Sequence, residues 1–330
     1  MTASTPPRPA RRRPALAAAL AAALLTTAAG ACSSGGGGGD GALRIVINPA
    51  TPPALPLIAE KNGDFTANGV KAKITTLPST SITTFAPALG RQYDIAWGTP
   101  ADVIAAKAKG HDIKVVAAAY ADGRDHEQAQ VFAAKKGGVT ALSGLAGKRI
   151  ATPSLSGTLY LSVLTALRKN GVDPKKATLV EVPFPNMLDQ LNAGRVDAVA
   201  TIQPFIGAVK AAGHTPLGDP FLSIATPAVA GMWIADRAWA EKNPARVASF
   251  VKSLDAADAW ATAHPADARA FLAAALKLPP QVMAKVPLPD WQSAVTPEAL
   301  KPWIDAVAAA GQVNGKLPAP ADLILTPQPK

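Results

Sequence analysis

The segment LAGKRIATPSLSGT, residues 145–158, decides the fold of this 330-residue chain. An apolar run ends at Thr152, a turn rich in hydroxyl side chains follows, and a helical pattern begins near Thr158. A strand that passes through a short turn into a helix is the repeating unit of α/β sheets. The free amides at the start of such a helix favour anions. The segment therefore predicts an α/β fold with an anion site at this turn.

The same order of strand, short polar residues and helix recurs at three other places. It is found at residues 43–52, 94–100 and 197–205. These units fall into two blocks, 43–120 and 149–212, and two separate small sheets in one chain commonly pack as lobes with a cleft between them. In open α/β sheets, ligands bind outside the carboxyl ends of strands. We therefore expect the four polar strand ends to face one crevice.

Periodicity predicts the individual elements. Strands are expected at 43–47, 70–77, 93–97, 113–120, 131–134, 149–152, 177–182, 198–202 and 232–235. Helices are expected at 55–62, 101–109, 159–169, 186–193 and 205–212, and the chain finishes with helices at 246–263, 266–277 and 298–310. A proline-rich stretch, 278–289, separates the last two.

The first 31 residues have the pattern of a signal peptide. Arginines at 8 and 11–13 precede an apolar run, 15–25, that is too short to span a bilayer comfortably. Small residues then lead to Cys32, the only cysteine, in a stretch that resembles a bacterial lipobox except that Ala29 replaces the usual leucine. We expect a lipidated Cys32 with a Gly-rich tether, 32–42, on the outer face of the membrane. The alternatives are an incidental cysteine beside a simple cleavage site and a twin-arginine signal.

Composition and charge exclude several classes of protein. With 48% hydrophobic and 17% charged residues, the chain is neither disordered nor membrane-embedded. Without the four arginines before Cys32, 29 basic and 23 acidic residues leave a net charge of +6, down from +10. These charges are scattered, which favours anionic ligands mildly and gives no reason to expect nucleic acid.

A catalytic or metal site is not expected. The four histidines, 111, 126, 214 and 264, have no metal-ligand spacing. The cluster 125–127, Asp-His-Glu, is interpreted as a solvated loop, and no Gly-x-Ser-x-Gly elbow or phosphate loop is present. We therefore predict a protein that is not an enzyme and that has no cofactor.

Four segments carry a resemblance to a known family. They are 57–65 with its helix, Gly63 and Phe65; 93–100; 145–151, Leu-x-Gly-Lys-x-Ile-Ala; and 191–205, with Gly-x-Val-Asp-Ala before Pro-Phe. Over about residues 43–275 the chain resembles binding proteins for aliphatic sulfonates, taurine, nitrate and thiamin-pyrimidine precursors, which serve ABC importers. Catalytic members of the wider superfamily have a cysteine-rich motif that is absent from this sequence.

The resemblance implies the type 2 periplasmic binding protein fold. Each of its two lobes has a mainly parallel sheet flanked by helices, and two hinge crossovers, near Val131 and Met232, join the lobes. Lobe 1 is expected to comprise 43–130 and 232–330, and lobe 2 to comprise 131–231.

The resemblance also implies which residues contact the ligand. Ser156, Gly157 and Thr158 are expected to hold an anionic head group. Thr99 is expected to approach from the opposite lobe, and Gln203 from a second strand end.

Three further residues are expected as walls of the cleft, although core packing explains Trp97 equally well. They are Thr51, Trp97 and Tyr120. Asp197 is expected to support its turn rather than touch the ligand.

The predicted function is that of a lipid-anchored, monomeric solute-binding protein of an ABC importer. It would capture a small anionic solute, foremost an aliphatic sulfonate or taurine, and deliver it to the permease and its ATPase. The alternatives are a nitrate, carboxylate or thiamin-pyrimidine-precursor binder, and a two-lobe sensor input protein. An extracellular hydrolase ranks third, because no nucleophile–base pair is visible.

Overall fold

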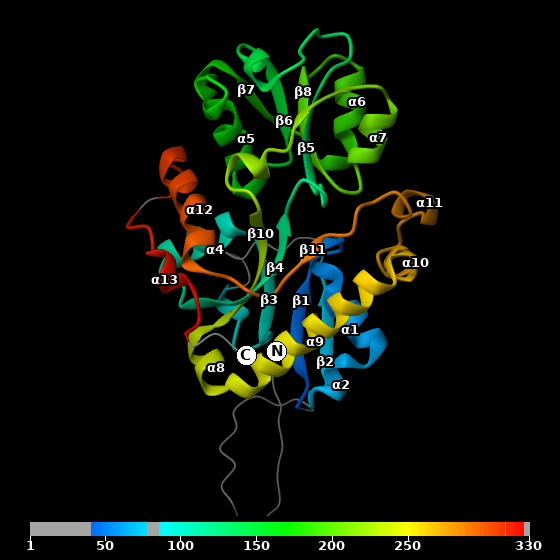
Figure 1. Ribbon diagram of the computed structural model, residues 1–330. Helices are drawn as coiled ribbons and strands as arrows, with labels where there is room; N and C mark the ends of the chain where they lie inside the picture. Colours follow the sequence, from blue (N-terminus) through cyan, green and yellow to red (C-terminus); the bar gives the residue numbers. More distant parts are fainter. Residues whose placement is uncertain (1–40, 78–85, 314, 327–330) are drawn as a thin grey trace, which may run out of the picture. The chain divides into compact units, whose positions relative to one another are not determined.

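Two β-sheets, each flanked by helices, make up residues 41–77, 86–313 and 315–326, the part of the chain that the computed structural model describes (Figure 1). The predicted signal peptide, Cys32 and most of the predicted tether lie outside these residues. No helix in the described ranges is both long and apolar enough to cross a bilayer.

We propose sheet 1 and the helices packed on it as lobe 1. Its strands are β1 (Leu43–Ile47), β2 (Ala72–Thr76), β3 (Ile95–Gly98), β4 (Ile113–Asp122), β10 (Ala228–Asp236) and β11 (Asp290–Trp291). They lie in the order β11-β4-β10-β3-β1-β2. The pairs β1–β2 and β1–β3 are parallel, whereas β10 runs antiparallel to β3 and β4, and β11 runs antiparallel to β4.

We propose sheet 2 and its helices as lobe 2. Its strands are β5 (Ala129–Ala133), β6 (Arg149–Thr152), β7 (Thr178–Glu181), β8 (Ala198–Ile202) and β9 (Thr215–Gly218). They lie in the order β7-β6-β8-β5-β9, with β6 parallel to β7 and β8, and β5 antiparallel to β8 and β9.

Both sheets are therefore mixed, with a parallel part and an antiparallel part, where the sequence predicted mainly parallel sheets. Strands β5 and β10, which are antiparallel to both of their neighbours, each begin directly after a connection between the lobes. Residues 123–128 lead from β4 into β5, and residues 219–227 lead from β9 back into β10. Because β4 leaves sheet 1 and β10 returns to it across the same gap, these neighbouring strands run in opposite directions. We propose these two segments as the crossovers, a few residues before the predicted positions.

The helices follow the strand ends, as the periodicity predicts. Those of lobe 1 are α1 (Leu55–Asn62), α2 (Asp64–Ala67), α4 (Pro100–Ala108), α8 (Arg237–Lys242), α9 (Pro244–Ala263), α10 (Pro265–Ala275), α11 (Pro280–Met283), α12 (Pro297–Ala310) and α13 (Pro320–Leu323). Those of lobe 2 are α5 (Gly157–Lys169), α6 (Met187–Asn192) and α7 (Ile206–Ala211). Short 3-10 turns lie at 52–54, 86–88, 142–145, 174–176, 184–186 and 221–223.

An aromatic core joins helix α9 to sheet 1. The ring of Phe250 on α9 lies 5.3 Å from Trp233 of β10, edge to face, and 6.4 Å from Phe65 of α2. Each of these side chains is almost completely buried, so α9 is fixed against sheet 1.

The two sheets share one local arrangement. An arginine near the start of one strand hydrogen-bonds to the aspartate that directly precedes a parallel strand of the same sheet. In lobe 1, Asp94 accepts from the Arg44 backbone N–H at 2.9 Å and from its Nη2 at 2.5 Å. In lobe 2, Asp197 accepts from the Arg149 backbone N–H at 2.8 Å and from its Nε at 3.1 Å. We call these pairs the Arg–Asp clamps. Asp197 thus supports its turn, as predicted, and the contact with Arg149 lowers its pKa.

Candidate ligand-binding site

Helix α5 begins at the hydroxyl-rich turn that the sequence singled out. The hydroxyls of Ser154 and Ser156 lie 3.0 Å apart, and the Ser156 N–H donates to Ser154 Oγ at 3.2 Å. Ser156 is the N-cap residue, but its side chain makes no bond to the helix, so ordinary capping does not explain this hydroxyl. The exposed Ser156 hydroxyl bonds only to the Ser154 hydroxyl, so it can also contact a ligand.

The start of α5 meets the start of α4 from the opposite lobe. The Ala101 N–H in the first turn of α4 donates to Thr158 Oγ1 at 3.2 Å, a bond between the two lobes. Thr99 donates its hydroxyl to Asp102 Oδ2 at 2.7 Å. Thr158 and Thr99 are thus brought to one place, but both side chains are already engaged with α4.

A cavity of about 490 Å³ lies beside these two helix starts. Ser156, Gly157 and Leu161 of α5 line it together with Asp102 and Lys109 of the α4 region. The remaining wall comes from α4, α12 and the residues after α12: Ala101, Ala105, Val307, Gln312 and Val313. This α4–α5 cavity holds donors, one carboxylate and one ammonium, and falls in the size range of small-molecule sites.

Glycine is favoured at position 157 by the backbone conformation as well as by the position of this residue in the cavity wall. Its φ is +80°, in the left-handed region, although a Cβ there would meet no atom within 4 Å. Any larger residue is therefore strained at this position. A bulky residue here would therefore lower the stability of the fold as well as fill part of the cavity.

Asp102 is a site residue that the sequence did not reveal. It occupies the first turn of α4, where an acidic residue is common for reasons of helix stability alone. Burial raises the pKa of this carboxyl, an effect that the Thr99 hydroxyl partly offsets. A cationic group of a ligand would favour its charged form.

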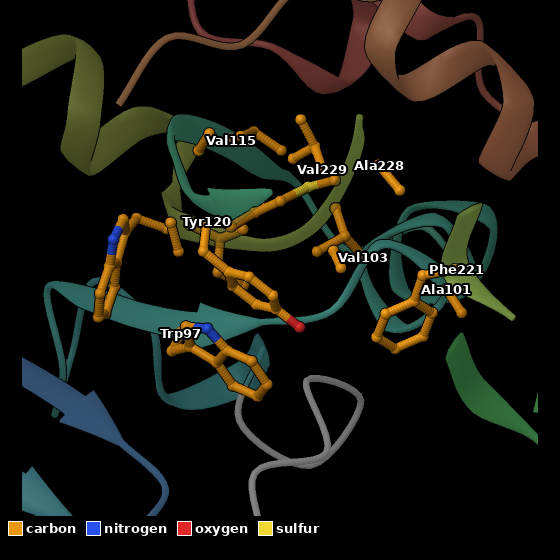
Figure 2. Close-up of a cluster of buried hydrophobic side chains, with 14 of the residues drawn as sticks. Trp97, Ala101, Val103, Val115, Tyr120, Phe221, Ala228 and Val229 are labelled. Carbon is orange, nitrogen blue, oxygen red and sulfur yellow. The ribbon is translucent and has the colours of Figure 1, made fainter. Parts of the chain in front are cut away.

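Trp97 and Tyr120 pack together on sheet 1, as Figure 2 shows. Both side chains are more than nine-tenths buried and lie over the backbone of Gly231 in β10. A Cβ on Gly231 would lie 2.6 Å from Tyr120 Cε1 and 3.0 Å from Trp97 Nε1. Gly231 is thus what allows the two rings to sit together.

We expect Gly231→Ala to lower the free energy of unfolding by about 1–3 kcal/mol, because the added methyl group must displace the Tyr120 ring. Urea denaturation measures this change. Gly123→Ala is the matched control, because a Cβ there meets no atom within 4 Å and its φ is not in the left-handed region. An equal, small effect of both substitutions would contradict the packing described for Tyr120.

Three buried polar atoms at the ends of β1 and β3 have no hydrogen-bond partner among the described residues. They are Asn48 Oδ1, Thr51 Oγ1 and Trp97 Nε1. Unpaired buried groups are costly, and a bound ligand or ordered water commonly satisfies them. Thr51 and Trp97 therefore remain candidate ligand contacts, and Asn48 becomes a further one. The sequence feature that could have identified Asn48 is its position directly after the first strand.

Gln203 lies apart from the α4–α5 cavity. Its side chain is buried and donates from Nε2 to the Glu127 carbonyl at 3.3 Å. It lines a different cavity, of about 390 Å³, which shares no lining residue with the first. The structure therefore gathers the predicted residues into three groups: the α4–α5 cavity, the Trp97–Tyr120 wall and the surroundings of Gln203.

Two buried carboxyl groups mark the crossovers. Asp122 ends β4 and accepts from the Gln128 N–H at 3.2 Å, and Asp219 follows β9 and accepts from the Phe221 N–H at 2.7 Å. The second oxygen of each is buried, and the two side chains hydrogen-bond to each other, which requires a proton on one of them. Burial and the charge of Asp219 raise the pKa of Asp122 to about 9, and burial raises that of Asp219 to about 6.

The described residues contain no group of three or more His, Cys, Asp or Glu side chains able to hold a metal ion. The cluster around His126 is therefore not such a group, and His126 Nδ1 lies 3.0 Å from the Leu288 carbonyl oxygen.

This arrangement of two sheets is the periplasmic binding protein fold. The structure resembles the periplasmic aliphatic sulphonate binding protein SsuA from Escherichia coli, with a TM-score of 0.76 and 20% identity, over 88% of this chain and 94% of that one. It also resembles the nitrate-binding protein NrtA from Synechocystis PCC 6803, with a TM-score of 0.67 and 12% identity, over 86% and 85% of the two chains.

Sequence comparison then shows the family. Residues 54–268, more than half of the chain, match the NMT1/THI5 like family, and the protein belongs to it. The taurine-binding periplasmic protein of Escherichia coli (strain K12) is 29% identical over 109 residues, 33% of this chain. The match spans about a third of that relative's length, 34%.

Proposed function

We propose that this protein is the solute-binding component of an ABC importer and captures a small solute with an anionic head group, foremost an aliphatic sulfonate or taurine. The observation that carries this proposal is the α4–α5 cavity, where helix starts from opposite lobes converge. A ligand held there contacts both lobes and would favour their closed arrangement over an open one. Membership of the family and the partial similarity to a taurine-binding protein support the same reading.

The head group would lie against the first turn of α5. The first amides of a helix have no acceptor within the helix, and the helix dipole adds positive potential there. The Ser156 hydroxyl is a further donor at the same place. Three sulfonate oxygens match this set of donors, and Gly157 lets the backbone approach them closely.

Asp102 favours taurine over a plain anion. A carboxylate within the cavity opposes a ligand that carries only negative charge, but it can accept hydrogen bonds from the ammonium group of an aminosulfonate. Nitrate and simple carboxylates have no such group. Within the proposed class we therefore rank the zwitterionic aminosulfonate first.

The remaining parts of the proposal come from the sequence. We propose export by a signal peptide and a lipid anchor on Cys32 outside the membrane. The protein would act as a monomer that delivers its solute to a permease and ATPase. Binding rather than catalysis is proposed because the similar proteins are named as binding proteins.

The test is Ser156→Ala, with taurine affinity measured by calorimetry. Loss of a hydrogen bond to a charged oxygen should weaken binding by about 1.5–3 kcal/mol. Stability should change little, because the hydroxyl does not cap the helix. Thr165→Ala is the control on the same helix, since its hydroxyl bonds the Leu161 carbonyl instead. Equal affinities of both variants would remove Ser156 from the head-group site.

A further inference from the structure

The cavity beside Gln203 has features of a second binding site. Its volume is about 390 Å³, within the range of small-molecule sites. One wall is α7 with the residues before it, 203–210 in lobe 2, and the other is the segment 281–287 around α11 in lobe 1 (Figure 1). Glu127 of the first crossover also lines it. We call this space the α7–α11 cavity.

The body of the α7–α11 cavity is apolar. Six of its lining residues present only hydrocarbon side chains: Pro204, Ile206, Ala208, Val282, Val286 and Pro287. Among the described residues only Leu155 and Val282 are large hydrophobic side chains classed as exposed, at 43% and 37%. Leu155 adjoins Ser156 at the first cavity, and Val282 lines this one. Val282 therefore continues the apolar wall of the cavity up to the solvent.

Charge in the α7–α11 cavity favours an anion. Lys210 comes from lobe 2 and Lys285 from lobe 1, and neither ammonium is within salt-bridge distance of a carboxylate in the described ranges. The one acidic residue, Glu127, is engaged, because its Oε1 accepts from Gln130 Nε2 at 2.5 Å. Two lysines against one carboxylate leave the lining of the cavity with a net positive charge.

We propose that the α7–α11 cavity is a second site, which takes a small organic anion with an apolar body. The apolar walls would cover the body, and Lys210 and Lys285 would pair with the anionic group. Because the walls come from both lobes, an occupant would stabilise their present spacing. The proposal is independent of the aminosulfonate site, since the two cavities share no residue.

The experiment measures binding of 1-naphthalenesulfonate to the whole protein by calorimetry, with and without excess taurine. Lys210→Met and Lys285→Met should each weaken binding about three- to fivefold, the range for a partly exposed ion pair. Lys175→Met, an exposed lysine outside both cavities, is the matched control and should bind as the parent does.

Gly207→Leu is the blocking variant. A Cβ on Gly207 meets no atom within 4 Å and its φ is not in the left-handed region, so the new side chain would enter the cavity without backbone strain. We expect it to abolish binding of 1-naphthalenesulfonate while taurine still binds. If this variant does not fold, the two lysine variants decide.

The proposal is overturned if 1-naphthalenesulfonate does not bind, if the blocking and lysine variants bind it as the parent does, or if taurine displaces it competitively. Competition would place it in the α4–α5 cavity. A protein that binds 1-naphthalenesulfonate with the expected pattern of variants but binds neither taurine nor an aliphatic sulfonate would contradict the proposed function and leave this second site supported.

Discussion

Asp122→Asn should flatten the dependence of stability on pH between about pH 6 and 9 and stabilise the protein at the upper end. In the folded protein, burial and the nearby Asp219 raise the pKa of Asp122 to about 9, whereas an unfolded aspartate titrates near 3.9. Between these values the folded state keeps a proton that the unfolded state has lost. Stability therefore falls as pH rises, by at most about 1.4 kcal/mol per pH unit for this one group.

Over the window from pH 6 to 9, the parent should lose up to about 4 kcal/mol of unfolding free energy. Below about pH 6, Asp219 adds to the slope in the same direction, because its pKa is raised to about 6. The other titratable groups near the pair are Tyr120 and Glu127. Asparagine stays neutral throughout and can donate to Asp219, so the variant should lack the slope.

Urea denaturation at a series of pH values makes the measurement. Asp125→Asn is the matched control, since Asp125 is an exposed carboxyl in the same crossover. A parent whose stability does not change between pH 6 and 9 would contradict the buried pair.

Asp94→Ala should cost about 2–4 kcal/mol of unfolding free energy, whereas Asp197→Ala should cost no more than about 1 kcal/mol. The two aspartates make the same bonds in the two Arg–Asp clamps, so the comparison isolates burial. The Asp94 side chain is 3% exposed and the Asp197 side chain 34%. Without Asp94, the Arg44 backbone N–H at the start of β1 loses its acceptor in a place that water does not reach easily. Without Asp197, water can accept the hydrogen bonds of Arg149 instead. Denaturant unfolding of both variants tests this, and equal losses would show that burial does not set the strength of the clamps.

Much of the fold was predictable from local signals. The bounds of β1, β6, β8 and α1 coincide with the predicted ranges, because each combines a clear apolar period with polar or glycine ends. Strands β9 and β11 were missed, since β9 contains Pro216 and β11 exists only through pairing with Tyr120 and Ala121. Strand direction was not predictable either, because it depends on how the chain passes between the lobes.

The site was predictable only in part, for a related reason. Ser156 and Gly157 line a cavity at the start of α5. The order of strand, hydroxyl-rich turn and helix in the sequence predicted a site at this place. Gln203 is also a polar residue between a strand and a helix, but it lines another cavity. The pairing of Asp122 with Asp219 joins two residues far apart in sequence. No local pattern marks such a contact, which arises only when the two crossovers lie side by side.

The most direct test of the proposed function is thermal unfolding of the protein in the presence of taurine, ethanesulfonate, nitrate, acetate and a thiamin-pyrimidine analogue. A ligand at about a hundred times its dissociation constant should stabilise the fold by about 2.7 kcal/mol, a readily measured shift. We predict that the two sulfonates raise the unfolding temperature, taurine at the lower concentration, and that Ser156→Ala reduces both shifts. Stabilisation by none of these compounds, or only by nitrate, acetate or the pyrimidine, would contradict the assignment of an aminosulfonate site between α4 and α5.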